Sequence, residues 1–139
     1  MLTISPYLNF NGNTEEVFNF YKSVFGGEFT TFQRFKDVPS ELPTSASAGE
    51  KIMHVALPIS KEVTLMGSDT HESFGAVKMG TNFSLSINTD TKKDTDRIFN
   101  ALAAGGQITM PLEKTFWGAY FGMLTDKFGI QWMVNCQLQ

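Results

Sequence analysis

The chain of 139 residues contains an internal repeat, which limits its possible folds more than any other feature does. One pattern (an apolar residue, two glycines, a long polar residue and an apolar residue) occurs at residues 25–29 (FGGEF) and again at residues 104–108 (AGGQI). Each copy follows apolar residues at helical spacing. Glycine pairs at such places are typical of helix ends, because glycine adopts left-handed backbone angles without steric cost. The repeat therefore predicts helices over residues 14–25 and 92–103.

Alternating apolar and polar residues flank both predicted helices, as expected for strands with one buried face. Residues 5–10 precede the first helix and residues 82–87 precede the second. In this alignment Leu8 matches Leu85, and Phe10 matches Ile87. A hairpin follows each helix and its next strand, and residues 54–66 align with residues 121–133 without a gap. The repeating unit is therefore βαβββ, present twice.

The repeat divides the chain into a first module (residues 1–68), a connector (69–80) and a second module (81–139). Residues 37–51 are rich in Pro, Ser and Ala and predict a mobile loop. A chain of this length and an apolar fraction of 42% can form one core. We expect a single α+β domain in which the paired modules form one cupped, eight-stranded mixed sheet with the helices outside.

Each sheet should have one face under its helix and one open face. The apolar residues of the strand must lie under the helix, so Phe83, Leu85 and Ile87 take that side and Asn82 takes the open side. By the repeat, Tyr7 takes the open side of the first module. A face lined by polar and aromatic side chains is typical of a ligand-binding cavity.

The last hairpin determines which later residues share the open face. Residues 126–129 (DKFG) favour a type I turn with a bulge, because Asp suits its first position and Gly the left-handed one. That register pairs Met123 with Met133 and points Trp132 toward the helix; through the repeat, it puts His54 on the open face. We predict one pocket lined by residues of both modules: Tyr7, His54, Asn82, Trp117, Phe121, Gln131 and Met133.

Composition excludes several kinds of partner and site. The net charge is −3 and the only arginines are Arg34 and Arg97, which argues against nucleic acid and anionic membranes as partners. The single cysteine, Cys136, excludes an intrachain disulfide and multi-cysteine metal motifs. The sequence has no run of roughly 18 apolar residues and no basic and apolar leader, so we expect a cytoplasmic protein.

The chain resembles a known family over essentially its whole length, and four stretches carry the resemblance. They are residues 6–29 (PYLNFNGNTEEVFNFYKSVFGGEF), 53–59 (MHVALPI), 65–69 (LMGSD) and 117–132 (WGAYFGMLTDKFGIQW). Paired βαβββ modules define the vicinal oxygen chelate superfamily of glyoxalase I, bleomycin-resistance proteins and extradiol dioxygenases, and these stretches are similar to its PhnB-like branch. The resemblance implies a cupped sheet, binding of a small molecule and a homodimer. That branch also has the label 3-demethylubiquinone methyltransferase, but this sequence has no G-x-G-x-x-G turn after a strand to hold a methyl-donor nucleoside.

The resemblance also implies where a metal would bind. Metal-dependent relatives use two His and two Glu, one from each of four strands. The matching positions are Ser5 (or Pro6), Met66, Asn82 and Met133. Thioethers, hydroxyls and amides are poor ligands for a hard or borderline divalent ion. We therefore predict a small-molecule-binding protein with no metal and no cofactor.

The two histidines, His54 and His71, leave an alternative function open. His54 is either a strand residue satisfied by a neighbour or a hydrogen-bonding or acid–base group of the cavity. His71 lies in the polar connector and is expected to be a solvated loop residue. The alternative is a metal-dependent lyase, isomerase or dioxygenase whose non-standard ligands are His54 with His71, Asp69 or Glu72.

Overall fold

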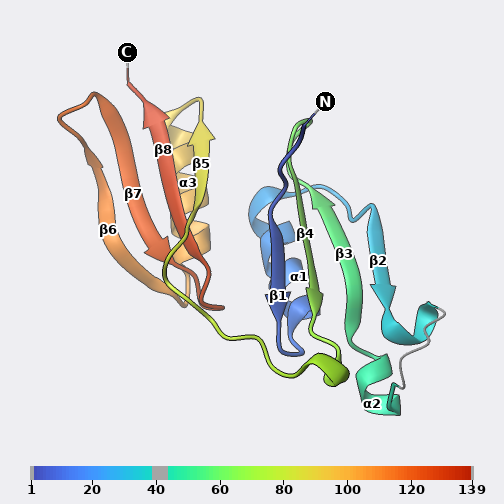
Figure 1. Ribbon diagram of the computed structural model, residues 1–139. Coiled ribbons are helices and arrows are strands. Elements are labelled where there is room, and N and C mark those ends of the chain that lie inside the picture. Colours follow the sequence, from blue (N-terminus) through green and yellow to red (C-terminus); the bar gives the residue numbers. More distant parts are fainter. Residues whose placement is uncertain (1, 39–43, 139) are drawn as a thin grey trace. The chain divides into compact units, whose positions relative to one another are not determined.

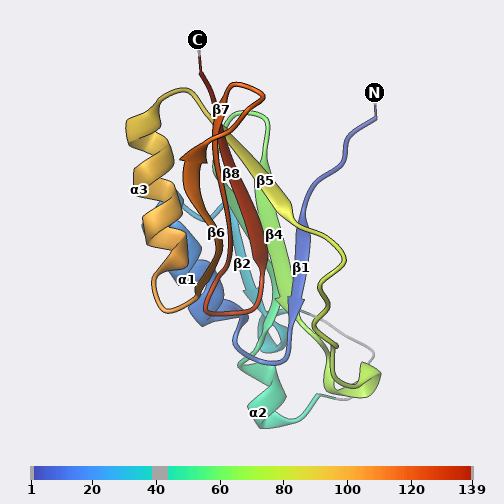
Figure 2. The ribbon, with the colours of Figure 1, turned by 90° about the vertical axis from the view of Figure 1, so that its left-hand side faces the viewer.

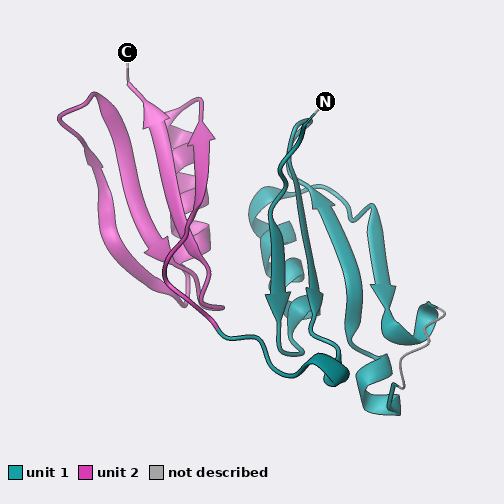
Figure 3. Cartoon of the chain, in the orientation of Figure 1, with its two compact units in different colours: residues 1–78 teal, residues 79–139 magenta. Residues whose placement is uncertain are grey.

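The computed structural model describes residues 2–38 and 44–138 and contains the βαβββ arrangement twice (Figure 1). The chain forms two compact units, residues 1–78 and residues 79–139 (Figure 3). Hydrogen bonds group the strands into two four-stranded sheets, with orders β1-β4-β3-β2 and β5-β8-β7-β6. The predicted α+β fold of paired βαβββ modules is confirmed, and the eight strands predicted for one sheet form two four-stranded sheets, one in each unit.

The first unit places one long helix against a mixed sheet. Its elements are β1 (Tyr7–Phe10), α1 (Thr14–Phe25), β2 (Thr31–Arg34), η1 (Phe35–Asp37), α2 (Ala46–Gly49), β3 (Ile52–Pro58), β4 (Thr64–Asp69) and η2 (Glu72–Phe74), where η marks a 3₁₀ helix. β4 pairs in parallel with β1 and antiparallel with β3, and β2 pairs antiparallel with β3. Val17 and Phe18 of α1 are fully buried, as are Val55 and Leu57 of β3. The core of this unit therefore lies between α1 and one face of the sheet.

The second unit repeats this plan. Its elements are β5 (Leu85–Thr89), α3 (Lys92–Ala103), β6 (Gln107–Lys114), β7 (Ala119–Thr125) and β8 (Gln131–Gln137). α3 runs along one side of this sheet (Figure 2). Phe99 and Leu102 of α3 are buried, together with Trp132 and Val134 of β8. Neither α1 nor α3, the longest helices among the described residues, is long and apolar enough to cross a membrane.

Both long helices span the predicted residues, and glycine follows each of them as expected. Gly26 has a φ of 77°, and its N–H donates to the carbonyl of Lys22 at the end of α1. Gly105 has the same φ of 77° after α3. At the start of α3, the hydroxyl of Thr91 accepts a hydrogen bond of 3.1 Å from the N–H of Asp94.

The predicted bulged hairpin between β7 and β8 is confirmed. Met123 lies opposite Met133 and Thr125 lies opposite Gln131. Gly129 takes the left-handed position with a φ of 92°. The register transferred through the repeat also holds in the first unit, where Ala56 lies opposite Met66.

The first strands of the two units align differently from the prediction. Leu8 lies opposite Gly67, and the repeat equivalent of Gly67 is Val134, which lies opposite Ile87. Leu8 therefore matches Ile87 instead of Leu85, a shift of two residues that leaves every side chain on the same face. Phe83 is 54% exposed, so its predicted place under α3 is wrong. The reason is that pairing with β8 begins only at Leu85, and Phe83 precedes the strand.

The predicted mobile loop, residues 37–51, contains a short helix. Its residues 39–43 lie outside the described residues, whereas residues 46–49 form α2, so the loop prediction is wrong there. Ser45 begins this helix, because its hydroxyl accepts a hydrogen bond of 3.2 Å from the N–H of Ala48. The predicted connector, residues 69–80, begins with the last residue of β4 and contains η2.

Candidate functional site

The face of the first sheet opposite α1 carries polar and aromatic side chains, and we call it the first open face. Leu8 and Phe10 of β1 are buried toward α1, so the alternate residues Tyr7 and Asn9 point to the other side. Pairing extends this face through β4 and β3. Its side chains are Tyr7, Asn9, Met53, His54, Ala56, Met66 and Ser68.

A bulge in β3 brings two consecutive residues to the first open face. Gln33 lies opposite His54, but the next residue of β2, Arg34, lies opposite Ile52, which leaves Met53 unpaired. Ile52 and Val55 are buried, whereas Met53 and His54 between them are half-buried. The extra residue of a bulge breaks the strict alternation of a strand, so both side chains can face the same way.

Tyr7 and His54 form a pair on this face. The Tyr7 hydroxyl lies 3.1 Å from Nδ1 of His54. Their rings are stacked, with centroids 5.6 Å apart and an angle of 21° between the planes. When the hydroxyl donates to Nδ1, the imidazole carries its own proton on Nε2, which then acts as a donor. The pair joins β1 to β3 across β4 and presents one ring nitrogen for a ligand.

A hollow of about 260 Å³ lies within the first unit; Tyr7 and His54 do not line it, but Met53, the chain neighbour of His54, does. Asn9, Met53 and Ser68 of the first open face contribute to its lining. Further lining residues follow β2 and β4: Phe35, Asp69, Thr70, His71, Phe74 and Val77. The Ser68 hydroxyl donates to Oδ1 of Asn9 at 3.2 Å. The amide nitrogen of Asn9 has no hydrogen-bond partner among the described residues, so it is a further donor beside the hollow.

His71 is buried, which contradicts the prediction of a solvated loop residue. Only 4% of its surface is exposed. Its Nδ1 accepts a hydrogen bond from the N–H of Ser73, and its Nε2 lies 2.9 Å from the Thr44 hydroxyl. The rings of Phe35 and Phe74 contact it edge-on, at centroid distances of 5.1 Å and 5.9 Å. The residues after β4 turn into η2, and this turn covers the histidine.

Asp69 is a buried structural carboxylate. Its Oδ1 accepts hydrogen bonds from the N–H of Gly12, the N–H of Thr14 and the hydroxyl of Thr14, at 2.8, 3.0 and 2.7 Å. Its Oδ2 accepts from the N–H of Ile52 at 2.9 Å. Asp69 therefore ties the start of α1 and the start of β3 to the end of β4. The sequence holds one signal for this role: an acidic residue at the helix-facing position of an alternating strand.

The residues proposed for a non-standard metal site have other partners. Both oxygens of Asp69 and both ring nitrogens of His71 are engaged as described. Glu72 accepts from the N–H and the hydroxyl of Ser45, and the first of these hydrogen bonds lowers the pKa of Glu72. Residues 2–38 and 44–138 contain no group of three or more His, Cys, Asp or Glu side chains placed to hold a metal ion. This donor set does not fit a divalent ion.

The positions at which metal-dependent relatives carry ligands fall partly outside the strands. Met66 and Met133 lie within β4 and β8. Ser5 and Pro6 precede β1, and Asn82 precedes β5 and is exposed. The prediction that Ser5 and Asn82 belong to the strands is therefore wrong.

The second sheet also has an open face, opposite α3. A Cβ on Gly122 would lie 2.8 Å from the Phe99 ring of α3, so Phe121 and Met123 on either side of it point away from the helix. Phe121 lies opposite Asn135, and Met123 lies opposite Met133. Trp117 lies in the loop between β6 and β7, and its ring contacts the Phe121 ring edge-on at 5.9 Å. The structure therefore brings Trp117 and Phe121 together in the second unit.

The polar residues predicted for this second face lie apart from that aromatic pair. The side-chain amide of Gln131 donates to the backbone carbonyl of Phe83, at the β8 end near the hairpin. Sequence reasoning missed an amide pair, in which Asn135 donates to Asn88 at 3.1 Å. This pair is the repeat equivalent of Ser68 and Asn9, and the corrected alignment of the first strands reveals it. Convergence of all seven predicted site residues on one pocket stays a prediction.

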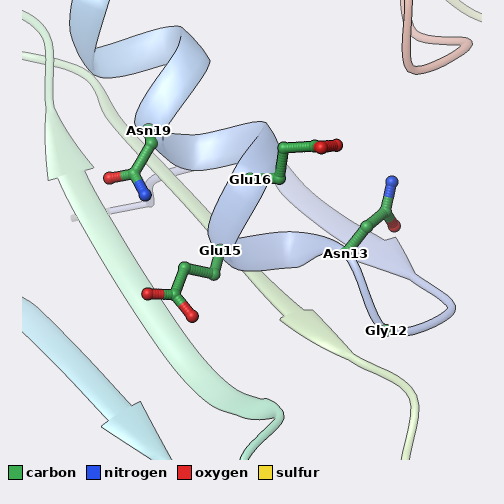
Figure 4. Close-up of a pocket in the computed structure, with 5 residues that line it drawn as sticks. All are labelled: Gly12, Asn13, Glu15, Glu16 and Asn19. Atoms are coloured by element: carbon green, nitrogen blue, oxygen red, sulfur yellow. The ribbon is translucent and has the colours of Figure 1, made fainter.

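A second hollow, of about 540 Å³, lies at the start of α1 (Figure 4). Its lining residues are Gly12, Asn13, Glu15, Glu16 and Asn19. Two hydrogen bonds of 2.9 and 3.0 Å join the guanidinium of Arg34 to both carboxylate oxygens of Glu15. These bonds lower the pKa of Glu15 and raise the pKa of Arg34. Glu15 thus stabilises the fold by linking α1 to β2.

We expect the Glu15→Gln substitution to reduce stability in a pH-dependent way. The folded pKa of Glu15 lies below its ordinary value of 4.5, so the ion pair contributes fully above that value. Its contribution is lost as the pH falls through the folded pKa. Because half of the Glu15 side chain is exposed, the loss at pH 7 should be only about 0.5 kcal/mol. Urea unfolding at pH 7 and at pH 3 measures both values. Glu16→Gln is the matched control and should leave the stability at both pH values unchanged. An equal loss of stability at pH 7 and pH 3 in Glu15→Gln would contradict the ion-pair explanation.

Each βαβββ unit has an open sheet face opposite its long helix. Two such units define a protein of the glyoxalase-like fold. A solved glyoxalase/bleomycin resistance protein/dioxygenase family enzyme from Burkholderia phytofirmans shares this fold, with a TM-score of 0.60 and 21% identity over 95% of this chain and 97% of that chain. Within the fold, residues 2–135 match the model of the 3-demethylubiquinone-9 3-methyltransferase family. The chain belongs to this family, whose relatives include PhnB-like proteins.

Three relatives show how the similarity extends over the whole chain. The crystal structure of protein PA1353 from Pseudomonas aeruginosa is 43% identical, has a TM-score of 0.88 and covers 100% of both chains. A putative 3-demethylubiquinone-9 3-methyltransferase, PhnB protein, from Bacillus cereus is 27% identical, with a TM-score of 0.75 over 97% of this chain and 99% of that chain. Protein YjdN of Escherichia coli is 33% identical over 96% of this chain and 95% of its own length.

Proposed function

We propose that this protein binds a small, partly aromatic molecule at the first open face, without a divalent metal. One observation supports this most: Tyr7 and His54 form a stacked, hydrogen-bonded pair on the same face whose residues Asn9, Met53 and Ser68 line a hollow of about 260 Å³. The pair offers an aromatic surface and an imidazole nitrogen. Pockets that combine apolar walls with a few placed polar groups are typical of small-molecule sites.

The charges around the hollow favour a neutral or anionic ligand over a cation. Asp69 lines the hollow, but its oxygens already accept four hydrogen bonds from the protein. The groups left for a ligand are the amide nitrogen of Asn9, which lines the hollow, and Nε2 of His54 on the same face, which is a donor when Tyr7 donates to Nδ1. Two donors suit a carbonyl or carboxylate oxygen, and Phe35, Met53 and Phe74 suit an aromatic ring beside it.

The alternative function, a metal-dependent lyase, isomerase or dioxygenase, has weaker support. Its candidate ligands Asp69, His71 and Glu72 are hydrogen-bonded to the protein, and only His54 keeps a ring nitrogen for another partner. Metal analysis of untagged protein tests this alternative. Stoichiometric metal in the unchanged protein, together with its loss in the His54→Ala variant, would favour the enzyme.

We expect Tyr7→Phe to weaken ligand binding by roughly three- to tenfold, because it removes the one hydrogen bond that orients His54. The probe is 4-hydroxybenzoate, titrated while the amide NMR signals of residues 7, 9, 54 and 68 are followed. Benzylamine, a cation of similar size, should not bind.

His54→Phe should weaken binding of 4-hydroxybenzoate at least as much as Tyr7→Phe does. Phe fits at this position because Phe121 occupies the equivalent strand position. The matched control is Tyr120→Phe, which removes a hydroxyl bonded to Asp96 in the second unit. Equal binding by all variants, or signal changes confined to other residues, would contradict the proposal.

We further propose that the protein forms a homodimer. Each sheet has two edge strands, β1 and β2 in the first unit and β5 and β6 in the second. β6 also exposes apolar side chains, since Ile108 and Met110 are 47% and 42% exposed. Light scattering at micromolar concentration should give about twice the chain mass of 15.5 kDa. The mass of one chain would refute the dimer.

A further inference from the structure

Three methionines stand in a row across the second sheet. Met110 of β6 lies opposite Met123 of β7, and Met123 lies opposite Met133 of β8. The register of β6 shifts on both sides of Met110, so its face is assigned from its pairing with Met123 and not from alternation along β6. Side chains directly opposite each other in an antiparallel pair lie on the same face, with Cβ atoms roughly 4.5–5.5 Å apart. The row therefore places three of the seven methionines of the chain side by side.

This methionine row lies on the face opposite α3. Gly122 and Leu124, the neighbours of Met123, face the helix: a Cβ on Gly122 would collide with Phe99, and Leu124 is buried. Met110 is 42% exposed, and Met123 and Met133 are half-buried. Their thioethers are accordingly outside the core of the second unit and within reach of solvent.

We propose that the methionine row binds a soft monovalent cation, Cu(I) or Ag(I). Thioether sulfur is a soft ligand that selects such ions over hard divalent ones. The unbranched, flexible methionine side chain lets sulfur atoms from three adjacent strands turn toward one ion.

The surroundings of the row are compatible with a cation. Glu113 lies opposite Phe121, so its carboxylate is on the same face, and the chain has a net charge of −3. Ser86 continues the row beyond Met133 and adds no positive charge. The site depends on the strand register of the second unit alone and does not rest on the small-molecule site proposed for the first.

The test is a titration with Ag(I), a probe that needs no reductant. It uses the full chain with Cys136→Ser, which removes the one thiol, and with the ε-methyl groups of methionine labelled with ¹³C. We expect one ion to bind and the methyl signals of Met110, Met123 and Met133 to shift together, while those of Met53 and Met79 stay in place. A competition with bicinchoninate gives the corresponding Cu(I) affinity.

Leucine substitutions distinguish coordination from a nonspecific effect. Met123→Leu keeps an apolar side chain of similar volume, so the fold should be retained, and it should weaken Ag(I) binding at least tenfold. Met79→Leu is the matched control, because Met79 is 46% exposed in the same unit but outside the row. Unchanged Ag(I) affinity in Met123→Leu would overturn the proposal. Shifts confined to Met53 or Met66 would overturn it as well.

Discussion

Replacing Asp69 by alanine should lower the free energy of unfolding by about 3–5 kcal/mol, since each unsatisfied buried donor costs roughly 1–3 kcal/mol. The substitution removes the acceptor of three backbone N–H groups, those of Gly12, Thr14 and Ile52. It also removes the partner of the buried Thr14 hydroxyl. These donors come from separate segments of the chain, so no single local rearrangement can satisfy all of them.

Urea unfolding followed by circular dichroism measures the effect of Asp69→Ala. Asp69→Asn should cost less, because the amide keeps one oxygen that can accept hydrogen bonds. Asp90→Ala, at an exposed position after β5, is the matched control and should change stability by less than about 0.5 kcal/mol. A loss of 1 kcal/mol or less for Asp69→Ala would show that Asp69 does not hold these segments together.

The role of Asp69 also shows where sequence reasoning ends. Local signals predicted both long helices and the register of the last hairpin: apolar spacing and glycines for the helices, and turn residues 126–129 for the hairpin. The partners of Asp69 are 17 and 55 or more residues away along the chain. The parallel pairing of β1 with β4 brings Gly12 and Thr14 to Asp69, and the antiparallel pairing of β3 with β4 brings Ile52. No local pattern encodes these contacts.

The sequence also predicted part of the candidate site, namely which residues share a sheet face. Strand alternation and the repeat placed Tyr7 and His54 on one face of the first sheet, and the structure joins them. The bulge that adds Met53 to this face depends on how β2 and β3 pair, which composition does not reveal. The prediction of a solvated His71 is wrong because it considered only the polar residues next to it in the sequence. Phe35, whose ring covers His71, comes from the end of β2.

The two tryptophans should respond very differently to substitution by alanine. Trp132 is 1% exposed, and its indole N–H donates to the buried carboxylate of Asp126 at 2.8 Å. Trp132→Ala should therefore lower the free energy of unfolding by about 3–5 kcal/mol, the usual cost of removing a large buried aromatic side chain. Trp117 is 51% exposed and contacts the rings of Phe116 and Phe121 only at their edges. Trp117→Ala should cost less than about 1 kcal/mol.

Chemical denaturation of both variants, with Leu85→Ala as a half-buried reference, tests which face of the second sheet is the core. A strand exposes alternate residues to opposite sides, so an error of one position in the register would exchange every core residue of β7 and β8 for an open-face residue. A loss for Trp117→Ala as large as that for Leu85→Ala would show that the loop before β7 packs into the core. A small loss for Trp132→Ala would reverse the two faces and, with them, the placement of Met123 and Met133.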